Sequence, residues 1–334
     1  MKQVTDDSRV IPTSLQALYT PIRDELAATE ALLLAELASD HPFVDLLAKH
    51  GFRLGGKRLR PALVLLCAQA AGTQRPEHVR LAGAVELIHT ATLIHDDVLD
   101  EAEIRRHLDT VNARWSNEAS VLLGDYLFSR AMCLAASVDD GYACRAIGDS
   151  ARVMCEGELR QVQHRGDYDL SEAEYYDIIA GKTGALLACC CRLGAHFAGA
   201  SEEHCAAMVR YGEQLGIAFQ IADDLLDLTG DEATAGKSLG TDLVKQKATL
   251  PLIRLLAVVS DEDRKSLMAA LMNSENERRD TFRDWLDRYG TLDYARDRAI
   301  EYACNAGKQL AGLPASRARA SLEGLCEFVV SRRQ

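Results

Sequence analysis

Apolar residues recur every three or four positions along most of the chain, which is the spacing of one face of an α-helix. Leu15, Leu18, Ile22, Leu26 and Leu33 form a first stripe of this kind. Period-two runs of Val, Ile, Thr and aromatic residues, which indicate strands, are missing. We therefore predict an all-α protein, a helical bundle of roughly a dozen helices around a central cleft.

The domain organisation is indicated by the absence of a linker in this helical pattern. A length of 334 residues is compatible with two domains. However, no Gly/Ser-rich or Pro-rich linker divides the chain, and the candidate site motifs are scattered from Gly55 to Lys247. We predict a flexible N-terminal arm over residues 1–13 and a single domain over residues 14–334.

Composition and charge exclude several classes of protein. The net charge of -12 argues against a nucleic-acid surface, which would carry a basic stripe. The ten cysteines show no C-x-x-C pair or zinc-finger spacing, so we expect reduced thiols in the cytoplasm. The N-terminus lacks the features of a secretory signal. The most apolar stretch, residues 183–200, contains Arg192 and His196, so we expect no transmembrane segment.

One acidic pattern occurs twice, as DDVLD at residues 96–100 and as DDLLD at residues 223–227. Each copy follows an apolar helical stretch, so Asp96 lies under Asp100 and Asp223 under Asp227. Like charges at this spacing repel, and the C-terminal part of a helix disfavours anions. Grouped carboxylates are ligands for Mg²⁺, which completes its shell with water and phosphate oxygens. Although one copy alone would usually be a solvated helix face, two copies predict acid clusters that face each other across a Mg²⁺-diphosphate.

The sequence GGKRLRP at residues 55–61 is a candidate anion cradle. It nearly matches a P-loop, but Arg58 replaces the required Ser or Thr and no convincing strand precedes it, so we exclude nucleotide binding. The glycines allow close backbone approach, Pro61 favours the first turn of a helix, and Lys57, Arg58 and Arg60 supply positive charge. An ordinary basic helix start remains an equal alternative.

Other polar residues stand near the acid clusters. His89 belongs to an E-x-x-H pattern, but a di-iron site would need a second copy. His89 is then either a hydrogen-bond partner of the substrate or a core histidine whose hydrogen bonds are satisfied. Arg105 and Arg106 should point in different directions and serve two diphosphates, unless they form salt bridges with acidic neighbours. A basic loop containing Lys237 and Lys247 is a candidate lid.

Together these motifs resemble those of the trans-isoprenyl diphosphate synthases, and within that family the long-chain polyprenyl type. The matching segments, in order, are GGKRLRP at 55–61, ELIHTATLIHDDVLDEAEIRR at 86–106, KTGAL at 182–186, FQIADDLLD at 219–227, and GK with DLVKQKATLP within 236–251. The resemblance covers nearly the whole chain and implies the isoprenoid synthase fold, Mg²⁺ as cofactor and a homodimer. Two departures are HLD at 107–109, where Gly-x-Pro is common, and Gln246 in place of a frequent Gly.

The same resemblance implies a role for each matching residue. The metal ligands would be Asp96, Asp100 and Asp223, supported by Asp97, Asp224 and Asp227. Isopentenyl diphosphate would be bound by Lys57, Arg60, His89 and Arg106. The allylic diphosphate would be held by Arg105, Lys182, Thr183, Gln220, Lys237 and Lys247. The groups expected to act directly in catalysis are Asp96, Asp97, Asp100, Asp223, Asp224, Lys182 and Lys237.

Product length is argued from the residues that precede the first acid cluster. Ala91 and Thr92 occupy the positions where short-chain members of the family place an aromatic side chain, so the floor of the product tunnel is open. One helical turn of about 5.4 Å is on the order of one extended isoprene unit, and the small Ala84 and Gly83 lie two turns deeper. We expect a long product, octaprenyl or nonaprenyl, unless Met132 and Leu134 close the tunnel sooner.

The predicted reaction is repeated condensation of isopentenyl diphosphate onto farnesyl or geranyl diphosphate, giving an all-trans product for a quinone side chain. Release of this apolar product is expected to involve peripheral membrane contact. The alternatives are a shorter-chain synthase, such as a geranylgeranyl or farnesylgeranyl diphosphate synthase, and a subunit of a heteromeric synthase. A terpene cyclase is disfavoured because it needs no second diphosphate site.

Overall fold

The protein is almost entirely helical in the computed structural model, which describes residues 14–54, 56–138, 141–229, 241–271 and 275–331. This confirms the all-α prediction. The predicted N-terminal arm (residues 1–13), Gly55 and Lys237 lie outside the described residues.

The first half of the chain folds into helices and one small β-hairpin. Its elements are α1 (Leu15–Leu18), the 3₁₀ turn η1 (Thr20–Ile22), α2 (Arg23–Leu37), α3 (Pro42–Arg53), α4 (Leu59–Ala71), α5 (Glu77–Leu99), β1 (Ile104–Arg105), β2 (Leu108–Asp109), α6 (Val111–Arg114), α7 (Asn117–Ala136) and α8 (Tyr142–Gln163).

The regular elements in the second half of the described chain are all helical. Its elements are α9 (Glu172–Ile179), the π-helical turn η3 (Ala180–Gly184), α10 (Ala185–Phe197), α11 (Glu202–Thr229), α13 (Thr241–Val244), α14 (Leu250–Val258), α15 (Asp261–Leu271), α16 (Glu275–Arg288), α17 (Thr291–Gln309) and α18 (Arg317–Ser331).

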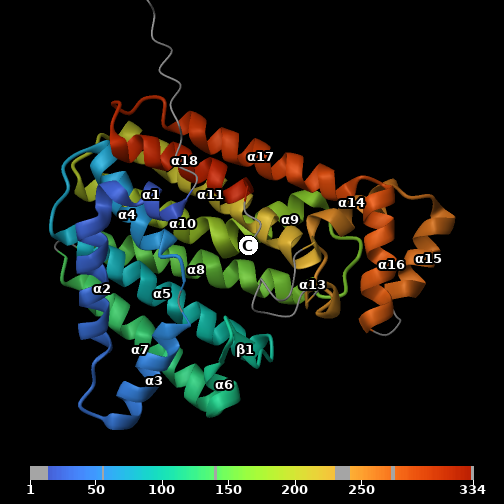
Figure 1. The fold of residues 1–334 in the computed structure, drawn as a ribbon, viewed down its shortest axis with the longest axis horizontal. Coiled ribbons are helices and arrows are strands. Elements are labelled where there is room, and N and C mark those ends of the chain that lie inside the picture. Colours follow the sequence, from blue (N-terminus) through green and yellow to red (C-terminus); the bar gives the residue numbers. More distant parts are fainter. Residues whose placement is uncertain (1–13, 55, 139–140, 230–240, 272–274, 332–334) are drawn as a thin grey trace, which may run out of the picture.

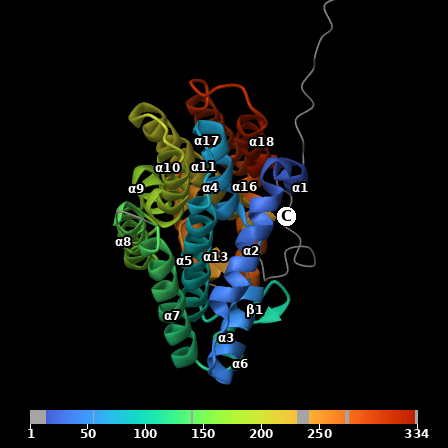
Figure 2. The same cartoon turned by 90° about the vertical axis from the view of Figure 1, so that its left-hand side faces the viewer.

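Helix α10 lies at the centre of the bundle, in contact with α4, α5, α8 and α11. Around it, α5 packs along α7 and α11 packs along α17 (Figure 1). The view in Figure 2 shows α5 between α7 and α2. One large hydrophobic core fills the bundle, and a second fills the space between the end of α11 and α14–α17. Helices α5 and α11, which carry the two acid clusters, are therefore fixed along their length by apolar packing.

Local sequence signals set several helix starts. Ser171 and Glu174 form a reciprocal capping box at α9, and the Ser116 side chain accepts from the third backbone N–H of α7. Pro42 and Pro251 stand in the first turns of α3 and α14, where a missing N–H costs no helical hydrogen bond.

The β-hairpin follows directly after the first acid cluster. Ile104 pairs with Asp109 and Arg105 with Leu108, and the turn between the strands has positive φ at Arg106 (51°) and His107 (63°). Positive φ at both central residues is the geometry of a type I′ turn, which usually contains glycine. His107 therefore adopts a left-handed backbone at a position where the family commonly has glycine, the residue that adopts this conformation most easily.

Two helical stretches are long and apolar enough to cross a membrane by length and composition alone, among the described residues. They are residues 172–197, in which 72% of the most apolar window is buried inside the protein, and residues 117–136, in which 39% is buried. Core helices of soluble proteins have the same composition. The burial of the first stretch fits its position at the centre of the bundle.

Candidate active site

A cavity of about 430 Å³ is lined by the start of α4, the C-terminal half of α5, the β-hairpin, α8, η3, α11 and α18. Most of the predicted site residues line it: Lys57, Arg60, His89, Thr92, Asp96, Arg105, Arg106, Lys182, Thr183, Gln220 and Asp223. The predicted residues that are described but do not line it are Ala91, Asp97, Asp100, Asp224, Asp227 and Lys247.

Each acid cluster contributes one carboxylate to the cavity wall, Asp96 from α5 and Asp223 from α11. Burial raises the pKa of Asp96 to about 6, an effect that the nearby Lys182 opposes and Glu158 reinforces. The two helices thus bring acids 127 positions apart in the sequence to one cavity. This is the arrangement that two facing clusters require.

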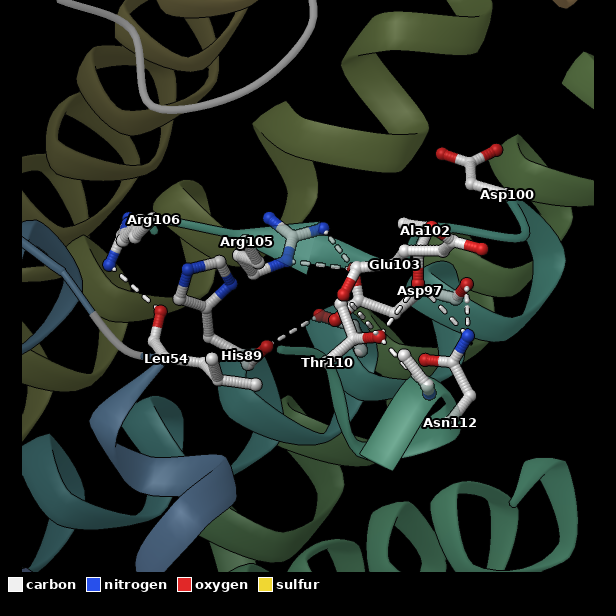
Figure 3. A network of polar contacts seen from close by, with 12 residues as sticks. Leu54, His89, Asp97, Asp100, Ala102, Glu103, Arg105, Arg106, Thr110 and Asn112 are labelled. Atoms are coloured by element: carbon white, nitrogen blue, oxygen red, sulfur yellow. Dashed lines mark hydrogen bonds and ion pairs between the residues drawn. The ribbon is translucent and has the colours of Figure 1, made fainter. Parts of the chain in front are cut away.

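The carboxylate of Asp97 forms an ion pair with Arg105. The Nε and Nη2 atoms of Arg105 both donate to Asp97 Oδ1, at 2.8 Å each (Figure 3). Asp97 is almost completely buried, and burial raises its pKa against the opposing effect of Arg105. Asp97 therefore fixes the arginine at the cavity wall.

Asp100 stands apart from this pair (Figure 3). It faces three cations from other segments. Its carboxylate lies 3.2 Å from Lys245 Nζ, 3.5 Å from Lys247 Nζ and 3.7 Å from Arg165 Nη2. Burial alone would raise the pKa of Asp100, but the charges of Lys247 and Lys245 lower it below its usual value. The last acid of the first cluster is thus surrounded by positive charge.

In the second cluster, Asp224 accepts hydrogen bonds from two neutral donors. Tyr175 Oη donates to Asp224 at 2.6 Å, and Gln220 Nε2 donates to the other carboxylate oxygen at 2.8 Å. Thr183 Oγ1 in turn donates to Gln220 Oε1 at 2.7 Å. Burial, together with the charge of Asp242, raises the pKa of Asp224 to about 8. These contacts fix the amide of Gln220 and the hydroxyl of Thr183 at the cavity.

Asp227 is also buried, and its Oδ2 accepts a hydrogen bond from the backbone N–H of Asp242 at 3.1 Å. This contact ties the start of α13 to the end of the acid cluster on α11. The loop that carries Lys245 and Lys247 is therefore anchored to both acid clusters.

Lys182 projects into the cavity from the π-helical turn η3. Its Nζ forms an ion pair with Glu158 at 2.5 Å and donates to Gln161 Oε1 at 2.7 Å. A side chain at Gly157 would overlap the backbone of Lys182, so the glycine lets α8 approach the turn closely. Burial lowers the pKa of Lys182, but Asp96 and Glu158 outweigh that effect and raise it. The ammonium group therefore stays charged.

A second set of donors lines the cavity at the start of α4. Arg60 is partly buried, and its buried Nε has no hydrogen-bond partner among the described residues. Arg106 Nη1 donates to the carbonyl oxygen of Leu54 at 3.0 Å (Figure 3), and a side chain at Gly56 would overlap its guanidinium group. Burial, together with Arg60 and Arg106, lowers the pKa of His89 far enough that the ring is neutral near pH 7. A guanidinium with a buried, unmet N–H donor calls for an anion.

The two neighbouring arginines of the hairpin point in different directions, Arg105 toward Asp97 and Arg106 toward Leu54 (Figure 3). Arg58 also lines the cavity, but its guanidinium group is engaged in ion pairs with Glu30 and Glu86, the latter at 2.7 Å. Its backbone is left-handed (φ 51°).

The donor set fits Mg²⁺ only if the substrate completes the shell. Among the described residues, no group of three His, Cys, Asp or Glu side chains is arranged to hold a metal ion by itself. Mg²⁺ is commonly bound by one or two carboxylates together with substrate phosphates and water. Asp96 and Asp223 supply carboxylate oxygens of this kind at the cavity.

The Polyprenyl synthetase family model matches residues 41–287. The chain belongs to this family. It is 34% identical over 320 residues to the octaprenyl diphosphate synthase of Escherichia coli K12, covering 96% of this chain and 99% of that protein. It is 35% identical over 289 residues to a short chain isoprenyl diphosphate synthase of Methanothermobacter thermautotrophicus, covering 85% and 89%.

A solved polyprenyl synthase from Caulobacter crescentus, complexed with calcium and isoprenyl diphosphate, has the same fold as this polyprenyl synthetase. The TM-score is 0.91 at 37% identity, covering 96% of this chain and 99% of that one. This polyprenyl synthetase is accordingly a transferase, a trans-polyprenyl diphosphate synthase with the isoprenoid synthase fold.

Sequence reasoning missed three residues that this polyprenyl synthetase places at the acid clusters: Tyr175, Arg165 and Lys245. Tyr175 lies seven positions before Lys182, where its aromatic ring reads as core packing. Arg165 is a single charge near a turn, and Lys245 stands in the matching segment DLVKQKATLP without an assigned role. No local signal links any of the three to an acid cluster, because each reaches its partner only through the tertiary fold.

Proposed function

We propose that this polyprenyl synthetase uses Mg²⁺ to add isopentenyl diphosphate repeatedly to farnesyl or geranyl diphosphate, giving a long-chain all-trans polyprenyl diphosphate. The proposed product is octaprenyl diphosphate, for a quinone side chain. The observation that carries the proposal is a single cavity with an acid from each cluster and two separate groups of cationic donors. Two groups of cations fit two diphosphates.

The residues divide into two roles. Arg105, Lys182, Lys237 and Lys247 hold the allylic diphosphate beside Asp96, Asp100 and Asp223. Bound Mg²⁺ would stabilise the charge on the departing diphosphate. The fixed cations act in the same direction, because they already face the position where negative charge develops.

Isopentenyl diphosphate is held by Lys57, Arg60, Arg106 and the neutral ring of His89. When the allylic C–O bond breaks, its electrons leave with diphosphate, and the double bond of isopentenyl diphosphate attacks the allylic carbon. A proton is then lost from the condensed chain. No side chain of the motifs is suited as a base, so the released diphosphate accepts this proton.

For product length, Ala91 and Thr92 leave the floor next to the first cluster without an aromatic barrier. Ala91 is fully buried, and Thr92 lines the cavity. Ala91→Phe is therefore expected to shorten the product, as measured by chromatography of dephosphorylated products. A product of unchanged length would contradict this account of the floor.

One observation favours a shorter product, of the geranylgeranyl or farnesylgeranyl class, as the second candidate. A side chain at Gly83 would lie 3.3 Å from Leu32 and 3.5 Å from Leu134, so both leucines reach α5 there. Gly83 precedes Asp96 by 13 residues, about 20 Å along the helix or on the order of four isoprene units. If the leucines form the floor, Leu134→Ala will lengthen the product, whereas an octaprenyl synthase will give the same product with either residue.

A homodimer is part of the proposal, and its support is an exposed apolar surface. On α7, Leu122 is 68% exposed and Val121 and Phe128 are also exposed, as are Leu159 and Val162 on α8. Large exposed apolar side chains on adjacent helices are typical of a covered interface. A dimer is expected by light scattering, and a stable, active monomer would refute it. We further propose a cytoplasmic location with peripheral membrane contact during product release.

The direct test incubates purified protein with farnesyl diphosphate, isopentenyl diphosphate and Mg²⁺. A ladder of products that ends at one long polyprenol is the expected result. Absence of elongation by a folded, Mg²⁺-supplied protein would refute a self-sufficient synthase and favour the heteromeric-subunit alternative, in which a second chain restores activity.

A further inference from the structure

Asp100 has three cationic neighbours, and two of them have no role in the sequence-based assignment. Lys245 lies at 3.2 Å and Arg165 at 3.7 Å, beside Lys247 at 3.5 Å. Arg165 comes from the turn after α8, and Lys245 from the loop after α13. Segments 65 and 145 residues away from Asp100 therefore converge on one carboxylate.

The backbone holds these cations in place. The N–H of Gly166, next to Arg165, donates to the carbonyl oxygen of Gln246 at 2.9 Å. Gln246 has a left-handed backbone (φ 56°), and the N–H of Lys247 donates to the carbonyl oxygen of Asp242 at 2.8 Å. The loop and the turn are thus joined to each other, so Arg165 and Lys245 face Asp100 from a connected frame.

The charges around Asp100 do not balance. Three positive groups face the carboxylate of Asp100, and their side chains are 10 to 34% exposed, so solvent compensates them only partly. Lys247 also pairs with Asp242 at 4.0 Å, whereas Arg165 and Lys245 have no other carboxylate partner among the described residues. A cation that takes Asp100 as a ligand must displace Arg165 and Lys245, which are then left without a carboxylate. The partner that satisfies them is an anion bound to the same cation.

We propose that Arg165 and Lys245 are further diphosphate-binding residues, which exchange Asp100 for the allylic diphosphate when a divalent cation binds Asp100. The inference rests on the proposed function, because it takes Asp100 as a metal ligand. According to this proposal, Arg165 and Lys245 have opposite effects on the binding affinities of two ligands. They compete with the metal alone, and they strengthen binding of the metal-diphosphate pair.

The test compares Lys245→Gln and Arg165→Gln with Arg152→Gln, an exposed arginine of α8 paired with Glu156. Isothermal titration calorimetry measures Mg²⁺ alone, and then inorganic diphosphate in saturating Mg²⁺. Loss of a competing cation is expected to tighten Mg²⁺ binding about two- to fivefold. Loss of a charge-assisted contact is expected to weaken diphosphate binding about tenfold. The control should change neither affinity.

A purely structural role would weaken both affinities or neither, and either pattern would overturn the proposal. Lys245→Arg keeps the charge and should keep wild-type values for both ligands. Thermal unfolding of each variant shows whether the fold is intact. The outcome is separable from the product assay, since opposite shifts in the two affinities support the exchange even if the wild-type enzyme makes a product of unexpected length.

Discussion

The two acid clusters share one sequence pattern, but Asp97 and Asp100 of the first are paired with cations, whereas Asp224 of the second accepts from neutral donors. Around the first, Arg105 binds Asp97, and Lys245, Lys247 and Arg165 face Asp100. In the second, a tyrosine hydroxyl and a glutamine amide donate to the carboxylate of Asp224, and a backbone N–H donates to that of Asp227.

This difference separates two tasks. Charged partners interact over longer distances and can be exchanged when a metal or diphosphate enters, so the first cluster is coupled to its ligands. Neutral hydrogen bonds are short and directional, and they fix Asp224 before any ligand arrives. Repetition of a motif in sequence therefore does not imply repetition of its electrostatic environment.

The largest effect is expected when the ion pair between Asp97 and Arg105 in the first cluster is broken. Arg105→Met leaves the buried carboxylate of Asp97 without its cation, which should lower the free energy of unfolding by about 3 kcal/mol. Urea unfolding measures this change. The double variant Arg105→Met/Asp97→Asn removes the unpaired charge and should recover part of the loss. A loss below about 1 kcal/mol would mean that the pair behaves as an exposed salt bridge.

The second prediction uses pH to isolate the second cluster. The pKa of Asp224 is raised to about 8 from its ordinary value of 3.8, so the folded state binds the extra proton. The contribution of protonated Asp224 to the free energy of unfolding is complete below about pH 4 and is lost as the pH rises through 8. Asp96, whose pKa is about 6, contributes the same trend only at lower pH.

Between pH 6 and 8, the metal-free protein should therefore lose up to about 1.4 kcal/mol of stability per pH unit through Asp224. Asp224→Asn should flatten the curve in this window, whereas Asp96→Asn should leave the upper half of the window steep. Chemical unfolding at a series of pH values measures both. Identical curves for wild type and Asp224→Asn would show that this carboxyl is already ionised.

The smallest effect concerns the turn that presents the two arginines. His107 has a positive φ, and a left-handed residue with a side chain is disfavoured by about 1 kcal/mol or slightly more. His107→Gly should raise the unfolding free energy by roughly this amount. Ala206→Gly, in the right-handed helix α11, is the matched control and should lower it by about 1 kcal/mol. Equal destabilisation by both changes would exclude backbone strain at His107.

The sequence allowed the helical architecture and the pairing of the acid clusters to be predicted, because helical periodicity and a repeated motif are local signals. Helix geometry also implies that Asp96 and Asp97 point about 100° apart and cannot both face one cavity. Which of them does so depends on the hairpin that delivers Arg105. The hairpin itself was not predicted, since its two-residue strands are too short to show a period.

The remaining site residues were unpredictable for a related reason. Arg165, Tyr175 and Lys245 act through contacts with residues 49 to 145 positions away, and no spacing rule connects such pairs. Arg58 illustrates the converse. Its position in a basic motif grouped it with the anion cradle, but the fold pairs it with Glu86 instead.

The central claim is that both clusters act on one Mg²⁺-diphosphate. The most direct measurement is the Mg²⁺ dependence of equilibrium binding of a non-ionising thio analogue of farnesyl diphosphate to wild type, Asp96→Asn, Asp223→Asn and the double variant. We predict that each single change removes most of the Mg²⁺-dependent affinity and that the double variant loses little more. Full Mg²⁺-dependent binding by Asp223→Asn, or additive losses in the double variant, would contradict a shared site.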